Sequence, residues 1–86
     1  MGAMTMNQTY ERQFGYNIRT AREKRGMTQE ALAAQLQIKG CDITRGALAK
    51  IETGLRHVYP DEIRCIRECL HVSYETLFEG NEKREK

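Results

Sequence analysis

Hydrophobic side chains recur three and four positions apart along most of this chain, which is the spacing of helices with one buried face. Phe14, Ile18 and Ala21 form the first such stripe and predict a helix over about 11–25, ended by Gly26. No segment alternates apolar and polar residues for long enough to form a strand. The pattern therefore predicts an all-α fold.

Two short helices follow in the middle of the chain. The first extends over 29–36 behind Thr28, whose side chain suits a helix N-cap. The second begins at Thr44 and continues to Thr53, after which Gly54 provides the residue type that most often ends a helix. Together the two segments predict a helix-turn-helix pair.

The second helix of this pair has an apolar face and a polar face. Ala47, Leu48 and Ile51 recur at helical spacing and are expected to face the core. The opposite face lacks bulky apolar groups and consists of Arg45, Gly46, Ala49, Lys50 and Thr53. Two cations among small side chains suit the major groove of DNA, although a simple solvated helix face would have the same pattern.

Two further helices are predicted after Pro60, the only proline in the chain. Pro60 fits the first turn of a fourth helix, because that position has no need of a backbone N–H. This helix directs three apolar residues inward, Ile63, Ile66 and Leu70. A short fifth helix over 74–79 is expected to close the core with Leu77 and Phe78.

The connection between the second and third helices, 37–43, is unusually long for a helix-turn-helix pair. Ile38 and Ile43 are expected to anchor it in the core. Cys41 could be exposed there, with nothing nearby in the sequence that marks a redox switch. Lys39 either reaches a DNA phosphate or is simply solvated.

Length and charge predict how the chain is divided and which part of it carries the positive charge. The 86 residues make one domain with a modest core. We expect residues 1–8 to be a cloning scar and flexible N-terminus, 9–79 to be the folded domain, and 80–86 to be a disordered charged tail. Residues 11–58 contain nine Lys and Arg against five Asp and Glu, whereas 59–86 contain five against seven. The basic half contains the helix pair, which fits contact with phosphates.

The remaining chemistry argues against catalysis and against secretion. Three cysteines, an odd number, and the lack of a long apolar run indicate a cytoplasmic protein that does not span a membrane. Cys65, Cys69 and His71 crowd one helix end without a second ligand pair, so the thiols are interpreted as small buried hydrophobes. Ser73 is the only serine and suits a helix N-cap. We expect no enzyme activity, cofactor, metal site or small-molecule substrate.

Four motifs in order resemble one known family. They are Ile18-Arg19-x-x-Arg22, then Gly26-Met27-Thr28-Gln29-Glu30-x-Leu32-Ala33, then Leu48-x-x-Ile51-Glu52-x-Gly54, and finally Leu70-x-Val72-Ser73. The chain resembles the phage-repressor or Cro-type (Xre-like) helix-turn-helix regulators over about 15–78. The resemblance implies a compact five-helix fold with a helix-turn-helix of helices two and three, and a homodimer on double-stranded DNA. The family's compact turn has about two residues, so this chain departs from the family by its extended turn over 37–43.

By position, the resemblance also implies residue roles. It assigns contacts with base edges to Thr44, Arg45, Gly46, Ala49 and Lys50. It assigns contacts with the DNA backbone to Gln29, Thr53, Arg56 and the loop with His57 and Tyr59, with bracing of the third helix as the alternative for Gln29. Arg22 and Glu52 are expected to pair between helices one and three, unless they are two unrelated surface charges. The dimer surface would involve the fifth helix with Tyr74 and Phe78.

The sequence therefore predicts a sequence-specific DNA-binding transcription regulator, more specifically a repressor that inserts the helix 44–53 in the major groove. One alternative is the same fold used as a protein-interaction module, such as an antitoxin or adaptor subunit. Another is the N-terminal DNA-binding domain of a longer regulator that senses a ligand or a peptide.

Overall fold

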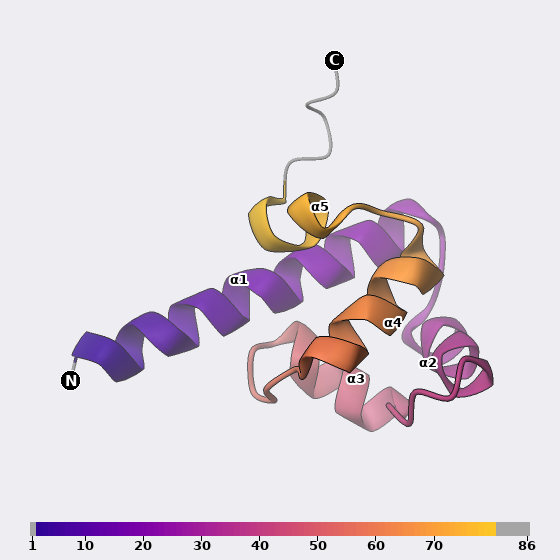
Figure 1. Cartoon of the computed structure of the whole chain (residues 1–86), viewed down its shortest axis with the longest axis horizontal. Helices are drawn as coiled ribbons and strands as arrows, with labels where there is room; N and C mark the ends of the chain where they lie inside the picture. Colours follow the sequence, from indigo (N-terminus) through magenta and orange to yellow (C-terminus); the bar gives the residue numbers. More distant parts are fainter. Residues whose placement is uncertain (1, 81–86) are drawn as a thin grey trace, which may run out of the picture.

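The structure, a computed structural model, is all-helical over the residues it describes, 2–80, with side chains described from Thr9 onward (Figure 1). Its elements are α1 (Gly2–Lys24), α2 (Gln29–Ile38), α3 (Arg45–Glu52), α4 (Pro60–Leu70) and α5 (Tyr74–Glu79). This confirms the predicted all-α class with a helix-turn-helix of α2 and α3. No helix in the described part of the chain is long and apolar enough to cross a membrane.

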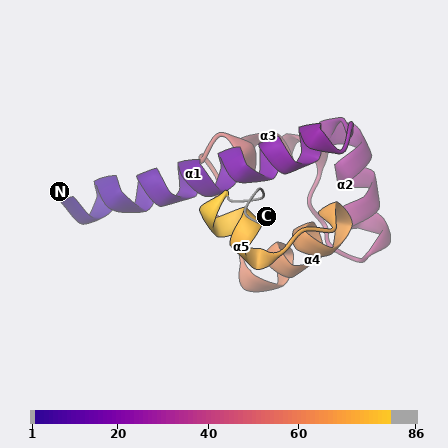
Figure 2. The same cartoon turned by 90° about the horizontal axis from the view of Figure 1, so that it is seen from above.

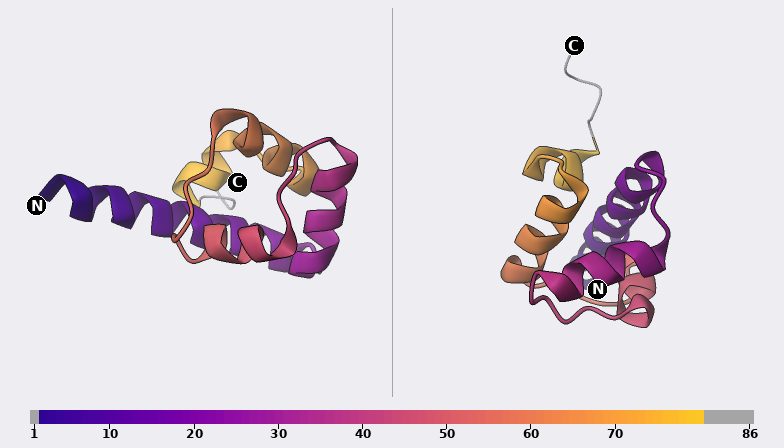
Figure 3. Two further views of the ribbon diagram at one scale, coloured as in Figure 1. Left: turned by 90° about the horizontal axis from the view of Figure 1, so that it is seen from below. Right: turned by 90° about the vertical axis from the view of Figure 1, so that its right-hand side faces the viewer.

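The helices enclose one core. From above (Figure 2) and from below (Figure 3, left), α1 and α3 lie on one side of the core and α4 and α5 lie on the other. Helix α2 closes one end. All five helices and the α2–α3 connection contribute buried apolar side chains, the largest being Ile18, Leu32, Leu36, Ile43, Leu48, Ile51, Ile66, Leu70 and Leu77. The N-terminal turns of α1 extend beyond this body (Figure 1).

Helix α1 begins at Gly2, well before the start predicted at about residue 11. The prediction placed its start where the apolar stripe begins, but residues 3–10 contain no proline or glycine that would stop the helix earlier. The predicted boundaries of a flexible 1–8 segment, a 9–79 domain and an 80–86 tail remain predictions. Residues 1 and 81–86 lie outside the described part of the chain.

Three of the helices begin as the sequence predicts, because a hydroxyl occupies each N-cap. The side chains of Thr28, Thr44 and Ser73 accept hydrogen bonds from the N–H groups three residues later, at 3.0, 3.1 and 3.0 Å. Each bond satisfies one of the N–H groups that a helix start leaves unpaired. Helix α4 instead starts with Pro60, and Glu62 accepts from the N–H of Tyr59 at 3.0 Å.

Two predicted core positions are wrong, and one residue expected at the surface is buried. Ile38 is 85% exposed, because it follows the buried Leu36 by two residues and so lies about 200° further round α2. Phe78 is 53% exposed, since the short α5 buries Leu77 and holds Phe78 at its edge, 4.9 Å from the ring of Phe14. Cys41 is only 7% exposed.

Helix α1 touches the end of α3 at the level of the backbone. A Cβ atom added at Gly15 would lie 2.1 Å from the carbonyl oxygen of Ile51. Gly54, at φ +80°, also lies close to α1, since a Cβ atom added there would lie 2.8 Å from the Cα of Arg12. These two glycines let α3 lie directly against α1, which determines where the outer face of α3 points.

Candidate nucleic-acid interface

Helix α3 separates its residues cleanly between core and solvent. Leu48, Ile51 and Glu52 are buried. The opposite face consists of residues that are exposed or half-buried, namely Thr44, Arg45, Gly46, Ala49, Lys50 and Thr53. The outward set predicted from the sequence therefore lies together on one face of a single helix.

The inner face of α3 is held by a buried ion pair. Arg22 of α1 donates from Nε and Nη2 to the two carboxylate oxygens of Glu52, at 2.7 and 2.9 Å. Its Nη1 donates to the carbonyl of Met27 at 2.7 Å. Donation to Glu52 is the main cause that raises the pKa of the Arg22 guanidinium. Arg22 and Glu52 are thus joined as the resemblance implies.

Gln29 adds a third member to this cluster. Its Nε2 donates to Oε1 of Glu52 at 3.0 Å, which ties the start of α2 to the end of α3. Because α1, α2 and α3 all meet at one carboxylate, the cluster sets the angle between the two helices of the motif. In this structure Gln29 has the bracing contact that the sequence left open.

Two hollows flank the exposed face of α3. One has a volume of about 380 Å³ and is lined by Arg22, Thr28, Gln29, Glu30 and Arg45. The other has a volume of about 540 Å³ and is lined by Thr44, Gly46, Ala47, Lys50, Leu55 and Arg56. The two cations predicted to contact bases thus lie beside different hollows: Arg45 lines the first and Lys50 lines the second.

Most of the predicted phosphate donors have partners within the chain. Arg56 forms a two-bond pair with Glu62 at 3.0 and 3.1 Å, and this contact lowers the pKa of Glu62 and raises that of Arg56. Lys39 lies 3.4 Å from a carboxylate oxygen of Glu68 on α4. The hydroxyl of Thr53 donates within α3, to carbonyls 3.2 Å away. The partners of Lys39 and Arg56 lie on α4, so the sequence pattern did not reveal them.

The loop after α3 is attached to α1 by a contact that the sequence analysis missed. Nδ1 of His57 lies 2.6 Å from Oε2 of Glu11. The ring of Tyr59 packs edge-on against His57, with 5.2 Å between centroids, while Tyr59 itself remains exposed. Forty-six residues separate His57 from Glu11, and no local spacing signals such a pair.

A third hollow, of about 220 Å³, is apolar and is lined by no residue of α3. It is lined by Tyr10, Glu11, Phe14, Arg56, His57, Val58, Ile63 and Phe78. No cluster of three His, Cys, Asp or Glu side chains suitable for a metal ion occurs among residues whose side chains are described.

Comparison with known families adds the identity of the fold. A helix-turn-helix family model matches residues 18–77, from the middle of α1 to Leu77 in α5. The chain belongs to the Xre/Cro-like helix-turn-helix family. No curated protein and no solved structure matches the chain significantly. The first part of α1 precedes the matched region, so Gly15 and Glu11 belong to a segment that the family pattern does not describe.

Proposed function

We propose that this helix-turn-helix protein is a sequence-specific transcription regulator, acting as a repressor, that inserts α3 in the major groove of a two-fold operator. The observation that carries the proposal is the division of α3 into a buried, ion-paired side and an exposed side with two cations. A groove-reading helix needs both properties, because its base-contacting side chains must be exposed to solvent while its axis is held still.

Arg45 and Lys50 are the proposed readers of base edges. Arg45 lies on the first turn of α3, where its guanidinium can donate two bonds to O6 and N7 of one guanine, a contact that gives about 1–3 kcal/mol of discrimination. Lys50 lies more than a turn later and can reach a second guanine. A Cβ atom added at Gly46 would meet its nearest neighbour, the hydroxyl of Thr44, only at 4.0 Å, so the DNA can approach the helix there.

The rest of this face makes modest contacts. Thr44 offers a hydroxyl that already caps the helix, and Ala49 offers a methyl group that suits a thymine methyl. Direct readout is therefore sparse, and sequence-dependent DNA shape supplies part of the specificity.

The DNA backbone is contacted from both ends of the motif. On one side Gln29 presents its amide beside the hollow next to Arg45. On the other, Thr53, Arg56 and Tyr59 follow in chain order, and Lys39 precedes α3. Arg56 and Lys39 exchange their glutamate partners for phosphate on binding, an exchange that partly exposed pairs permit at small cost.

A two-fold dimer places two such helices about one DNA turn apart, roughly 34 Å. The proposed dimer surface includes α5, where Tyr74 and Phe78 are exposed although both are large aromatic residues. Aromatic side chains of this kind are enriched in protein interfaces.

The experiment that tests this function selects a binding motif from a random DNA duplex pool and then measures affinity by fluorescence anisotropy at several salt concentrations. The Arg45→Ala/Lys50→Ala double variant should lose the selected motif and about tenfold or more in affinity. The control is Arg19→Ala/Arg64→Ala, which removes the same charge from exposed positions on α1 and α4. Equal, weak and motif-free binding by all three proteins would contradict the proposal and favour the protein-interaction module.

A further inference from the structure

The second hollow beside α3, with a volume of about 540 Å³, differs from the first in its lining. The first hollow is lined only by charged and polar residues. The second also has the methyl group of Ala47 and the side chain of Leu55 in its wall, and Gly46 adds no side chain there. It therefore combines open space with apolar atoms beside the face of α3 that is proposed to meet DNA.

Leu55 is the unusual member of this lining, because it is a large aliphatic residue that is 77% exposed. Its backbone is held against the end of α3. The N–H of Leu55 donates to the carbonyl of Lys50 at 2.8 Å, and the N–H of Gly54 donates to the carbonyl of Ile51 at 3.1 Å. A hydrophobic residue after such a glycine commonly packs on the last turn of its helix. The side chain of Leu55 is instead presented to solvent.

Single exposed leucines are ordinary on protein surfaces, so the neighbours of Leu55 decide what it can contact. Thr44, Gly46 and Lys50 line the same hollow and belong to the face of α3 that is proposed to meet base edges. Arg56 also lines it and is proposed to meet the DNA backbone. The hollow thus lies between the two kinds of contact. In the major groove, C5 of a pyrimidine occupies the corresponding place, between the hydrogen-bonding edge of the base and the backbone of its own strand.

We propose that this hollow accepts the 5-methyl group of a pyrimidine, with Leu55 and Ala47 as its apolar walls. Thymine has this methyl group and cytosine lacks it, so the hollow selects T·A pairs. 5-Methylcytosine presents the same group in the same place, so methylation of a cytosine there strengthens binding. This site rests on the proposed function and adds a ligand class to it, a pyrimidine with a 5-methyl group.

The chemistry of the wall favours a methyl group over the other groups of a base edge. The side chains of Leu55 and Ala47 have no hydrogen-bond donor or acceptor. Covering a base oxygen or amino group with them would remove its hydrogen bond to water without replacing it, which costs free energy. A methyl group has no such bond to lose and gains free energy with the apolar area that it buries.

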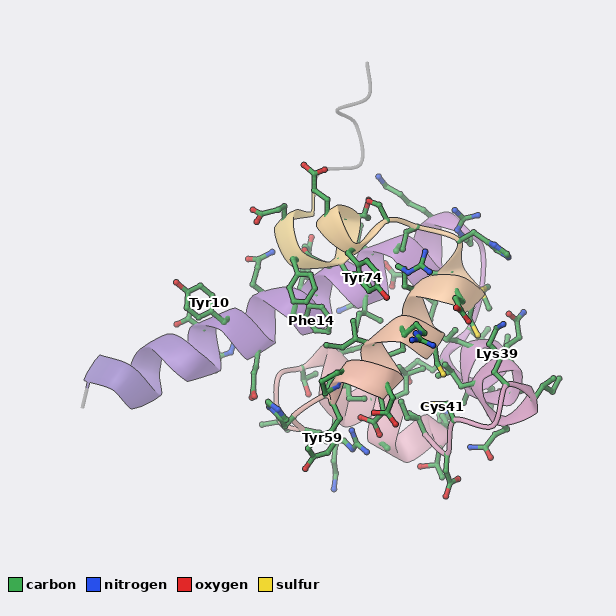
Figure 4. All side chains as sticks on the ribbon, viewed as in Figure 1. Tyr10, Phe14, Lys39, Cys41, Tyr59 and Tyr74 are labelled. Carbon is green, nitrogen blue, oxygen red and sulfur yellow. The ribbon has the colours of Figure 1, made fainter. Side chains whose placement is uncertain are left out.

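Ile38 provides a matched control, because it is a second exposed aliphatic side chain. It is 85% exposed at the end of α2 and lines neither hollow beside α3. Figure 4 shows Lys39, its neighbour in the chain, well apart from Tyr59, which ends the loop that begins at Leu55. Leu55→Ala and Ile38→Ala should each keep Tm within about 4 °C of the unchanged protein, since neither side chain is in the core.

The test uses the motif selected from the random duplex pool. Each thymine of the motif is replaced in turn by uracil and each cytosine by 5-methylcytosine, and fluorescence anisotropy measures the affinity for every duplex. At the position that meets the hollow, the unchanged protein should bind the methylated base about three- to fivefold more tightly, the size expected for one methyl group in an apolar contact. The other methylated and unmethylated pyrimidine pair is then compared at that position, which isolates the methyl group a second time.

The variants decide whether Leu55 is responsible. Leu55→Ala should lower the affinity ratio of methylated to unmethylated duplex below about twofold, whereas Ile38→Ala should retain the full ratio. Comparing the variants on the same duplexes removes the effect of the methyl group on base stacking within the DNA. A ratio below about twofold for the unchanged protein at every pyrimidine, or a ratio that Leu55→Ala leaves above it, would overturn the proposal.

The results also separate this site from the proposed function. If no motif is enriched, or if the Arg45→Ala/Lys50→Ala variant binds the motif unchanged, the proposed function fails and the methyl site fails with it. If the motif depends on Arg45 and Lys50 but no duplex responds to its methyl group through Leu55, the proposed function stands and only the methyl site is overturned.

Discussion

The two sides of α3 are held by ion pairs of very different burial. On the inner side, Arg22 and Glu52 have side chains that are 9% and 2% exposed. On the outer side, Arg45 and Glu30 are 63% and 76% exposed and lie 3.8 Å apart. Breaking a buried pair strands a charge away from water, whereas breaking an exposed pair returns both charges to solvent. The buried pair therefore fixes the position of α3, whereas the exposed pair can open and leave the outer face of α3 free to bind a ligand.

The largest expected effect comes from adding one methyl group on the inner side. Gly15→Ala should lower the free energy of unfolding by more than about 4 kcal/mol, because its Cβ would lie 2.1 Å from a backbone oxygen of α3. Urea unfolding followed by circular dichroism measures this.

Gly46→Ala is the matched control for that methyl group. Gly46 lies in a helix with open space around it, so alanine should stabilise the protein by about 0.5–1 kcal/mol. Similar stabilities for the two variants would mean that α1 and α3 do not touch through Gly15.

The next effect comes from opening the inner ion pair. Glu52→Ala should cost about 3 kcal/mol, since Arg22 would remain largely buried without its carboxylate. The control is Glu23→Ala, which breaks the exposed Arg19–Glu23 pair and should change stability little. Thermal melting of both variants tests this, and equal Tm values for Glu52→Ala and the unchanged protein would refute the positioning role of the pair.

A smaller, pH-dependent effect on stability is expected at the ion pair of Arg56 and Glu62, whose side chains are partly exposed. Arg56 lowers the pKa of Glu62, so their interaction stabilises the fold above the ordinary glutamate pKa and is lost as pH falls through the lowered value. Glu62→Gln should cost about 1 kcal/mol at pH 7 and progressively less in acid. Unfolding titrations from pH 7 to pH 3 measure the difference, and a constant difference would contradict this account.

The smallest effect on stability is expected on the outer side. Glu30→Gln removes the exposed partner of Arg45 and should leave the free energy of unfolding unchanged, while DNA affinity rises a few-fold because a carboxylate beside the phosphates is gone. Anisotropy at two salt concentrations tests this, with Glu75→Gln on α5 as a charge-matched control. An equal gain in both variants would show that only net charge matters.

Prediction from sequence succeeded where one short segment contains the N-cap, the apolar stripe and the terminal glycine of a helix. Thr44 precedes a stripe of apolar residues and Gly54 follows it, so the bounds and the outward face of α3 were both predictable. Ile38 and Phe78 were misplaced because each is apolar yet lies just beyond its helix's buried stripe. Helix α1 was predicted too short, since the apolar stripe of the sequence begins only at Phe14, whereas the first turns extend beyond the body.

The phosphate side of the interface was harder to predict, because the charges that modify it come from elsewhere in the chain. Arg56 is recognisable as a cation in the sequence, but its pairing with Glu62 depends on how the loop turns into α4. Cys41 likewise gave no signal by itself, and only the tertiary packing shows that it is buried.

By itself, the sequence determined the helical class, the caps and the polar outer face of α3, because these depend on side-chain periodicity and on hydrogen bonds within a few residues. The tertiary structure decided which charges are buried and paired, how closely α1 and α3 approach, and that Cys41 is buried. Those properties depend on distances between segments far apart in the chain, and burial changes the free energy of each contact. The same arginine and glutamate types therefore form a fixed support at Arg22 and Glu52 and an exchangeable contact at Arg45 and Glu30.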